Sequence, residues 1–460
     1  MKHTASCEPM HQAACRGLDC DMDGFRLPAP PGLRYRIFLF LYACTLGALE
    51  SLVWRYFRKR ARRDAPYGLH LDERKGEGPR FVTDLWLHAV SLGEVTAAEP
   101  LIRLALQDGH RVLTTHATPA GRDRAEQSFA DEISSGQMAV RYAPIDRPGY
   151  WRKFFATCKP RLGLVVEMEF WPWMIETARE AGVPLALVNS QVPASTWPKA
   201  RRMARLFGHA AARAATIFAK SETQAGRFRA LGAADVRIAG ETRFDMEPPD
   251  AQIRAGDALR KSLGGRSVLT IASVVDGEEE VYLRALAELF ADADAPFVIW
   301  VPRAPERFQA TRERLQAAGC KIMLRSKDLD PDLNPLSSPE RAQILVGDSL
   351  GEMNFYLAPA DAAIVGGGFG SHGAHNVIEP FALGKPAVTG PNLGTIEFPA
   401  IEAMNAGLLT ACEAPEALPD AARAALAQGP SERIRSFHAS HKGASRRIYD
   451  AVRPLLSGHH

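Results

Sequence analysis

The sequence lacks the features of disulfide-rich, zinc-binding and nucleic-acid-binding proteins. Its seven cysteines are an odd number and form no Cys-x-x-Cys pair, which is typical of cytosolic proteins without a disulfide framework. The formal net charge is only +3, so we expect no bulk attraction to nucleic acid, and no zinc-finger spacing occurs. Asp-x-Asp triplets are scattered through polar segments, so we predict neither a metal site nor a cofactor.

The chain does contain enough apolar residues for two cores. Hydrophobic residues make up 46% of its 460 residues, and this length exceeds one ordinary domain. From residue 81 onward, short apolar runs alternate with helical stretches, the pattern of parallel doubly wound sheets. A polar, proline-containing segment at 240–250 interrupts this pattern. We therefore predict an α/β protein with Rossmann-like domains over 64–245 and 246–430, followed by a C-terminal helical segment over 431–460.

The strands can be assigned from the apolar runs. The expected strands are 85–90, 111–115, 162–166, 184–188, 215–219 and 236–239 in the first series, and 267–272, 297–301, 343–346, 362–365 and 386–389 in the second.

The N-terminal region combines a polar tail with an apolar segment. Residues 1–32 are polar and end in a proline-rich stretch, which predicts a flexible tail. Residues 33–63 contain a thirteen-residue apolar run that precedes a cluster of Arg and Lys, a pattern of membrane interfaces. The run is shorter than the roughly 20 residues that cross a bilayer, and Glu50 is costly at depth. We expect the segment from Ile37 to Arg63 to lie in one leaflet; a helix that spans the bilayer and a buried core helix are the alternatives.

The densest group of candidate ligand-binding residues is a glycine-rich turn after the expected strand 362–365. Residues 365–380 are VGGGFGSHGAHNVIEP, and a helix is expected over 376–383. Free backbone N–H groups and a helix N-terminus at such a turn bind phosphate, and a carboxylate one turn inside the helix can accept hydrogen bonds from a ribose diol. The alternative is a tight turn in which glycine only relieves steric strain. The candidate nucleotide-binding residues here are Gly373, His375, Asn376 and Glu379.

A candidate catalytic carboxylate follows the expected strand 85–90. Ser91, Gly93 and Glu94 lie in a small-residue turn that begins a helix, at the sheet edge where open α/β sheets bind ligands. Ser91 and Gly93 are candidate substrate contacts, and Glu94 would be a general base if it reached an acceptor hydroxyl. Alternatively, Glu94 only complements the helix dipole.

Two further acidic residues, Glu167 and Glu169, follow the expected strand 162–166 and stand next to Trp171. Such a pair either binds sugar hydroxyls or favours the start of the helix at Pro172.

Three turns of the second half lie at the carboxyl edge of the second expected sheet. Arg303 follows the strand 297–301, where its planar guanidinium can bind a phosphate, unless it forms a surface ion pair with Glu306. The turn at 351–353 presents N–H groups to a nucleotide or simply begins a helix. The candidate nucleotide-binding residues of these turns are Ser273, Pro302, Arg303, Gly351, Glu352 and Met353.

The order of these motifs resembles that of the Kdo transferases, which attach 3-deoxy-D-manno-octulosonic acid (Kdo) to the lipid A precursor. The resemblance runs from about Leu33 to the C-terminus and includes the membrane segment. Its motifs are HAVSLGE at 88–94, EMEFWP at 167–172, PRAPER at 302–307, DSLGEM at 348–353 and GAHNVIEP at 373–380. The resemblance implies a GT-B glycosyltransferase fold, in which an acceptor-side domain and a nucleotide-sugar-binding domain face a cleft.

The resemblance also implies an activity, the inverting transfer of Kdo from CMP-Kdo to a lipid A precursor in lipopolysaccharide biosynthesis. Glu94 matches the proposed general base of the family. Arg303, the turn 351–353 and the segment 376–379 match positions that bind CMP. The leaving CMP carries one phosphate, which Arg303 and the helix after Gly373 would stabilise without a metal. Because the acceptor is a lipid, the resemblance places the enzyme at the cytoplasmic face of the inner membrane.

The chain departs from the family pattern at three motifs. Where relatives usually have PRHP, STHPGEE and NARLS, this chain has PRAP at 302–305, SVVDGEE at 273–279 and NSQVP at 189–193. The retained residues predict nucleotide binding and transfer. The two absent histidines and the absent arginine leave open a different donor or acceptor, or a non-catalytic paralogue that binds nucleotide or lipid.

Overall fold

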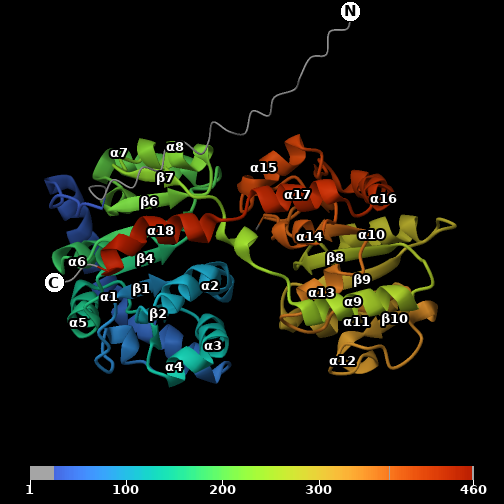
Figure 1. Cartoon of the computed structure of the whole chain (residues 1–460), viewed down its shortest axis with the longest axis horizontal. Coiled ribbons are helices and arrows are strands. Elements are labelled where there is room, and N and C mark those ends of the chain that lie inside the picture. Colours follow the sequence, from blue (N-terminus) through green and yellow to red (C-terminus); the bar gives the residue numbers. More distant parts are fainter. Residues whose placement is uncertain (1–24, 372, 458–460) are drawn as a thin grey trace, which may run out of the picture.

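A computed structural model describes residues 25–371 and 373–457 and contains two parallel sheets (Figure 1). The first has the strand order β3-β2-β1-β4-β5-β6-β7, and the second has the order β10-β11-β9-β8-β12-β13-β14. In each sheet the order reverses at the first strand, β1 or β8, so helices cover both faces. The prediction of an α/β protein with two doubly wound sheets is confirmed. Residues 1–24 of the predicted tail lie outside the described residues.

The strands of the first sheet are β1 (Leu85–His88), β2 (Val112–His116), β3 (Met138–Tyr142), β4 (Leu162–Val166), β5 (Leu185–Ser190), β6 (Thr216–Ala219) and β7 (Val236–Ile238). Those of the second are β8 (Val268–Val274), β9 (Phe297–Pro302), β10 (Ile322–Leu324), β11 (Ile344–Val346), β12 (Ala362–Val365), β13 (Ala387–Thr389) and β14 (Leu409–Ala411).

The helices before the second sheet are α1 (Leu33–Ala61), α2 (Leu92–Gln107), α3 (Pro119–Ser128), α4 (Ala130–Ser134), α5 (Pro148–Cys158), α6 (Pro172–Glu180), α7 (Trp197–Phe207), α8 (Glu222–Ala230) and α9 (Asp250–Ser262). The later ones are α10 (Glu279–Leu289), α11 (Phe308–Ala317), α12 (Arg325–Asp328), α13 (Met353–Leu357), α14 (Ile378–Ala382), α15 (Glu397–Asn405), α16 (Leu418–Gln428), α17 (Glu432–Ser440) and α18 (Ala444–Ser457).

Each expected strand has a counterpart, but β3, β10 and β14 were not expected from the sequence. All three lie at an edge of their sheet. The central strands β1 and β4 are buried on both faces and are continuously apolar, which is what made them visible in the sequence. The edge strands are only partly buried, so their apolar signal is short and interrupted.

The chain crosses between the domains twice. The first crossing contains the short 3-10 helix η5 (Thr242–Asp245), and the second lies between α17 and α18. The predicted segment 431–460 therefore holds two helices with different partners. α17 packs on the second domain, whereas α18 returns to the first and buries Ile448 and Val452 in its core (Figure 1). Asp245 joins the crossings, because its carboxylate accepts the N–H groups of Gly443 and Ser445.

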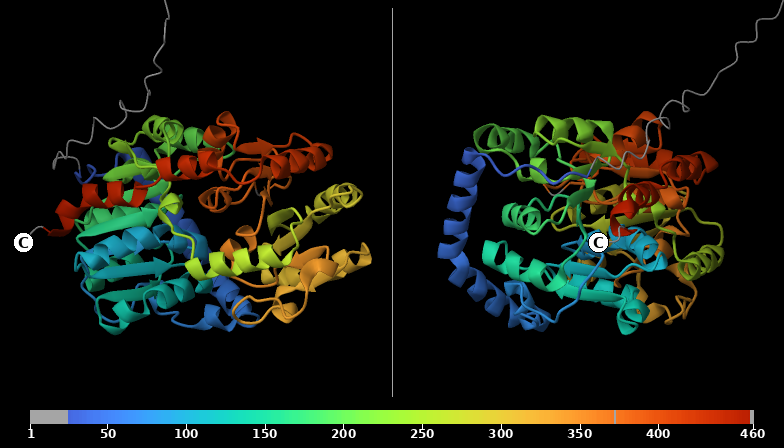
Figure 2. Two further views of the ribbon diagram at one scale, coloured as in Figure 1. Left: turned by 45° about the vertical axis from the view of Figure 1, so that its right-hand side comes forward. Right: turned by 60° about the vertical axis from the view of Figure 1, so that its left-hand side comes forward.

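Helix α1 lies along the outside of the first domain (Figure 2). Near its start, the ring of Phe38 lies 5.9 Å from that of Phe207 on α7. Further along, Glu50 accepts hydrogen bonds from Arg147 and Tyr150 of α5. Among the described helices, α1 alone is long and apolar enough to cross a membrane, yet only 6% of its most apolar window is buried. The alternative of a core helix is therefore wrong.

Candidate active site

The Glu94 carboxyl is buried at the start of α2, directly after β1. Its two oxygens accept the N–H of Val90 at 2.6 Å and the hydroxyl of Ser91 at 3.1 Å. Burial, together with the negative charges of Glu167 and Glu169, raises the pKa of Glu94 to about 8. Glu94 thus supports the start of its helix and is also a carboxyl whose pKa suits proton transfer near neutral pH.

Glu167 and Glu169, which follow β4, have different partners. The carboxylate of Glu167 lies 2.6 Å from Nη2 of Arg243 and 3.9 Å from Nζ of Lys220. Against the effect of burial, these cations lower the pKa of Glu167. Glu169 accepts a hydrogen bond from Nε1 of Trp171 at 2.5 Å, and burial raises its pKa. The two carboxyls therefore differ, because the pKa of Glu167 is lowered and that of Glu169 is raised.

Within the described residues, neither glutamate accepts a hydrogen bond from the first N–H groups of helix α6. That role belongs to Asp146, whose carboxylate accepts the N–H groups of Trp173 at 3.2 Å and Met174 at 2.8 Å. A contribution of Glu167 and Glu169 to the helix start through the helix dipole stays a prediction.

An ion-pair network that was not predicted lies beside these carboxylates. Nζ of Lys220, which follows β6, lies 2.6 Å from Glu241, and Nη1 of Arg243 lies 3.2 Å from the same carboxylate. Asn189 of β5 donates a third hydrogen bond to Glu241 at 2.8 Å. Against the effect of burial, the two cations lower the pKa of Glu241 to about 2. The sequence did contain a signal for these charged residues, because they follow strands of the first sheet as Glu94 does.

The N–H groups of the glycine-rich turn are largely occupied by a protein carboxylate. Glu278, which is 1% exposed, accepts the N–H groups of Gly367 at 2.6 Å, Phe369 at 2.7 Å and Gly370 at 2.9 Å. The expectation that these groups are free for a phosphate is wrong. The turn also approaches β8 closely, since a Cβ on Gly366 would lie 2.5 Å from the carbonyl oxygen of Ser273.

The segment after this turn faces the linker between the domains. α14 begins at Ile378, whose N–H is bound by Oδ1 of Asn376 at 2.9 Å. Burial raises the pKa of Glu379, while the positive charges of Arg243 and Arg303 oppose this effect. Glu379 is therefore within electrostatic reach of the linker and of the turn after β9. The neighbouring candidates Gly373 and His375 lie in the preceding turn. Gly373 has a φ of 88°, and the N–H of His375 donates to the carbonyl oxygen of Gly366 at 2.9 Å.

Arg303 is exposed at the end of β9, directly after Pro302. Its backbone N–H donates to the carbonyl of Val274 at 2.8 Å, which fixes the turn. Within the described residues its side chain forms no ion pair with Glu306, so the surface-pair alternative is not observed. The guanidinium is accessible to an anion.

The other two candidate turns of the second sheet differ in the groups that they expose to a ligand. Gly351 is exposed with a φ of 80°, and Met353 begins the short helix α13. The carboxylate of Glu352 is held by Arg325 through two contacts of 2.8 Å, so only its backbone is available to a ligand. Ser273 adopts a φ of 58° near the end of β8.

The topology explains how these residues gather. Glu94, Glu167, Asn189, Lys220 and the linker follow or end β1, β4, β5, β6 and β7, which are consecutive in the first sheet. The turn 351–353, Arg303, Ser273 and the glycine-rich turn follow or end β11, β9, β8 and β12, which are consecutive in the second. Each group occupies one carboxyl edge, where open α/β sheets bind ligands.

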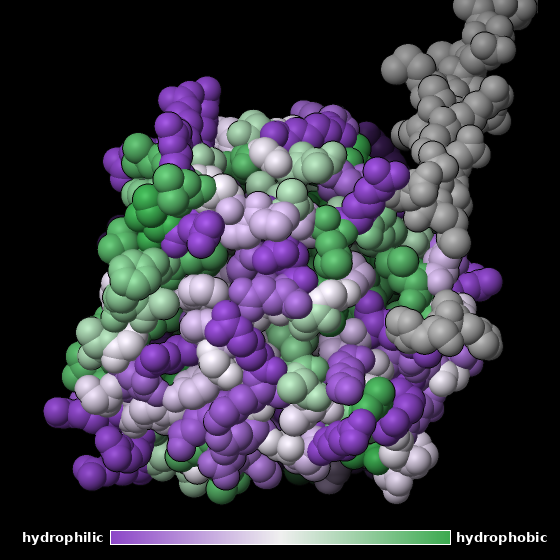
Figure 3. All heavy atoms as spheres, turned by 90° about the vertical axis from the view of Figure 1, so that its left-hand side faces the viewer, coloured by the Kyte–Doolittle hydropathy of each residue, from purple (hydrophilic) through white to green (hydrophobic). Residues whose placement is uncertain are grey.

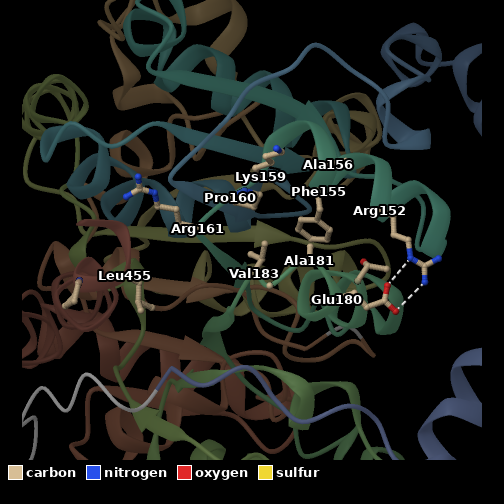
Figure 4. Close-up of a pocket in the computed structure, with 13 residues that line it drawn as sticks. Arg152, Phe155, Ala156, Lys159, Pro160, Arg161, Glu180, Ala181, Val183 and Leu455 are labelled. Atoms are coloured by element: carbon tan, nitrogen blue, oxygen red, sulfur yellow. Dashed lines mark hydrogen bonds and ion pairs between the residues drawn. The ribbon is translucent and has the colours of Figure 1, made fainter. Parts of the chain in front are cut away.

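A cavity of about 880 Å³ lies away from these residues, between α5, α6 and the end of α18 (Figure 4). Two of its lining cations already have partners. Arg152 is paired with Glu180, and Arg161 donates to the carbonyl of Leu456 at 2.8 Å. It contains none of the candidate residues. No group of three His, Cys, Asp or Glu that could hold a metal ion occurs among the described residues.

Comparisons with known proteins identify the relatives of this chain. A family model of the 3-deoxy-D-manno-octulosonic-acid transferases (kdotransferases) matches residues 60–246. The 3-deoxy-D-manno-octulosonic acid transferase of Bordetella pertussis is 36% identical over 432 residues, which cover 90% of this chain and 99% of the relative. The enzyme of the same name from Haemophilus influenzae is 30% identical over 433 residues, with 90% and 96% coverage.

A solved structure supports the fold. The glycosyltransferase of Rickettsia africae matches 82% of this chain and all of its own length with a TM-score of 0.55, at only 9% identity. Together with the two parallel-sheet domains, this likeness identifies the GT-B fold. By its sequence relatives, the chain belongs to the Kdo transferase family and is a glycosyltransferase.

Proposed function

We propose that the protein transfers Kdo from CMP-Kdo to a sugar hydroxyl of a lipid A precursor, with inversion at the anomeric carbon. The observation that carries this proposal is the Glu94 carboxyl, with its pKa of about 8, on the domain opposite the candidate nucleotide residues. Arg243 links the two halves, since it contacts the carbonyl of Gly93 at 3.3 Å and influences the pKa of Glu379.

In the proposed reaction, ionised Glu94 accepts the proton of the acceptor hydroxyl. The hydroxyl oxygen forms a bond to the anomeric carbon of Kdo while the bond from that carbon to the CMP phosphate oxygen breaks. Attack from the face opposite the leaving group inverts the configuration. Ser91 and Gly93 lie beside the acceptor, as do Glu167 and Glu169, whose oxygens can accept hydrogen bonds from sugar hydroxyls.

The donor side is proposed to bind CMP through turns rather than a deep pocket. Arg303 would bind the single phosphate and stabilise the charge that grows on it as the bond breaks. Asn376 and Glu379 would contact the nucleoside, together with Ser273, Pro302, Gly373, His375 and the backbone of Gly351, Glu352 and Met353.

The test is a transfer assay with purified protein, CMP-Kdo and tetraacylated lipid A precursor in detergent. We expect CMP release and Kdo-lipid detected by mass spectrometry, and loss of both in Glu94→Gln. Glu99→Gln is the matched control, because Glu99 lies on the same helix but pairs with Arg103 and Arg124 at 2.9 Å. CMP binding without any turnover would instead favour a non-catalytic paralogue, and turnover with another nucleotide sugar a different donor.

We further propose that the enzyme binds the inner membrane at its cytoplasmic face through the segment from Ile37 to Arg63. The outward face of α1 carries large apolar side chains that are exposed, namely Leu33, Ile37, Phe40, Leu41, Leu49, Leu52 and Tyr56. Figure 3 shows hydrophobic side chains along the left margin of the molecule. Helix α1 stands on the same side in the right view of Figure 2. The exposed Arg55, Arg58 and Lys59 follow and would contact anionic headgroups.

The contacts of α1 with the first domain favour lying in one leaflet over spanning. Glu50 is held by Arg147 and Tyr150, so a spanning helix would have to abandon these partners. Phe40→Asp should reduce sedimentation with vesicles of phosphatidylethanolamine and phosphatidylglycerol. The control is Leu336→Asp on the other domain, since Leu336 and Phe40 are both 66% exposed. Equal binding by both variants would contradict a membrane contact at this face.

A further inference from the structure

Arg243 occupies an unusual place, because it lies on the linker between the domains and also touches the catalytic region. Its helix η5 packs against α2, which carries Glu94, and against α14, which carries Glu379. The linker is anchored on both sides of Arg243. The ring of Phe244 is fully buried 5.0 Å from that of His441, and Glu241 is held by Lys220.

The guanidinium of Arg243 makes three kinds of contact. Nη2 donates to the carboxylate of Glu167 at 2.6 Å and to the carbonyl of Gly93 at 3.3 Å, while Nη1 donates to Glu241 at 3.2 Å. Against the effect of burial, Glu167, Glu241 and Glu94 raise the pKa of Arg243, so it stays charged. Gly93 immediately precedes Glu94, so this contact reaches the first turn of α2.

We propose that Arg243 is a positioning residue of the reaction centre, whose guanidinium fixes the Gly93 carbonyl and the Glu167 carboxylate and thereby sets the place and charge of Glu94 relative to the donor half. This inference rests on the proposed role of Glu94 as general base. Arg243 acts through Glu94 and is not itself a base or an acid, because a guanidinium does not lose its proton in proteins.

Charge balance explains why the position needs a cation. Glu94 faces Glu167 and Glu169 from the turn after β4, the hydroxyl of Ser91 from its own turn, and Arg243 from the linker. Arg243 in turn faces Glu241 and Glu379. Without the guanidinium, the negative charge of Glu167 is offset less, by Lys220 at 3.9 Å, and ionised Glu94 becomes harder to form.

The test compares Arg243→Gln, Arg243→Lys and a control on α18, which follows the second crossing, Arg447→Gln. Arg447 donates to the carbonyl of Ala239 at 3.0 and 2.8 Å and, among the residues that the structure describes, binds no carboxylate, so its loss affects the segment before the linker without changing the charge around Glu94. We expect Arg243→Gln to move the midpoint of the pH dependence of kcat/KM upward by about 1 unit or more, which lowers the rate at pH 7 about tenfold. Arg243→Lys should restore most of the midpoint, and Arg447→Gln should leave it unchanged.

A titration that needs no turnover separates this inference from the proposed function. The carboxyl signal of Glu94 in 13C-labelled protein, identified by its loss in Glu94→Gln, should titrate about 1 unit higher in Arg243→Gln. Absence of Kdo transfer by the unaltered protein would overturn the proposed function alone. An unshifted Glu94 signal in folded Arg243→Gln would overturn the role of Arg243.

The double variant Arg243→Gln/Glu167→Gln covers the case in which Arg243→Gln does not fold. It removes the cation together with Glu167, the carboxylate it approaches most closely, and the buried Glu241, which also loses Arg243, keeps Lys220 at 2.6 Å. We expect the Glu94 titration to return to within about 0.5 units of the unaltered protein, as a coupled pair requires. If Glu167→Gln alone and the double variant titrate alike, Arg243 has no influence on Glu94 and the inference is wrong.

Discussion

The two halves of the site are built differently. On the first domain, the candidate side chains are held by ion pairs, such as the buried pair of Lys220 with Glu241 at 2.6 Å and the half-buried pair of Arg243 with Glu167 at 2.6 Å. On the second, the candidates lie on backbone turns, and within the described residues the Arg303 side chain forms no ion pair. The comparison teaches that the first half holds its charged side chains in place through one another, as the proposed proton transfer requires, while the second leaves a cation open to an anion.

The strongest test of the organised half is Glu94→Gln. The amide keeps the size and most hydrogen bonds of the carboxyl but cannot accept the proton, so kcat should fall by about 10²- to 10⁴-fold. Steady-state kinetics with CMP-Kdo measures kcat, and calorimetry with CMP should give an unchanged affinity because Glu94 lies on the other domain.

The same variant should be more stable at high pH. The pKa of Glu94 is raised by burial, so its ionisation costs stability as the pH rises through about 8. Glu94→Gln removes that cost, and its thermal midpoint at pH 9 should exceed that of the unaltered protein, whereas the two should agree more closely at pH 5.

A variant with normal kcat would exclude Glu94 as the base.

On the second half, the largest effect should come from Glu278→Gln. The carboxylate of Glu278 accepts three N–H groups of the glycine-rich turn and the Tyr282 hydroxyl at 3.0 Å. An amide replaces charge-assisted bonds with weaker ones and directs its own N–H groups at donors, a loss of about 1.5–3 kcal/mol. Thermal unfolding should show a midpoint lower by several degrees, at roughly 2–4 °C per kcal/mol.

Glu280→Gln is the matched control, since Glu280 lies in the first turn of α10, close to Glu278 in sequence, but is exposed and within the described part of the chain pairs only with Arg284. Equal midpoints for the two variants would mean that the turn does not depend on Glu278.

The contrast between the halves also explains what the sequence could predict. The buried central strands and the motif residues that follow them were visible, because continuous apolar runs ending in Gly, Glu or Arg mark the carboxyl edge of a parallel sheet. The partners of those residues were not. Glu278 directly precedes α10, yet it binds a turn about 90 residues later, a long-range contact that no local pattern encodes. Arg243 was hidden in what was interpreted as a domain boundary.

The open cation is tested by Arg303→Ala. If the guanidinium binds the phosphate of CMP, its loss removes charge-assisted hydrogen bonds of about 1.5–3 kcal/mol. The affinity of the protein for CMP should then fall about 10- to 100-fold. Calorimetry with CMP and with cytidine separates the causes, because cytidine has no phosphate and should bind both proteins equally. Arg307→Ala is the control, since Arg307 is paired with Asp276 and Glu279. A parallel loss for cytidine would mean that Arg303 only supports the turn.

The smallest effect is expected for Glu169→Gln, and it has an unusual sign. The negative charge of Glu169 contributes to the raised pKa of Glu94, so the amide should lower the midpoint of the pH dependence of kcat/KM by less than about 1 unit. Because the reaction needs ionised Glu94, the rate at pH 7 should rise while the alkaline plateau is unchanged. If Glu169 instead binds an acceptor hydroxyl, its loss raises KM for the lipid at every pH. Kinetics at pH 7 and pH 9, with Glu180→Gln on α6 as a distant control, decide whether the organised half uses this carboxyl for charge or for contact.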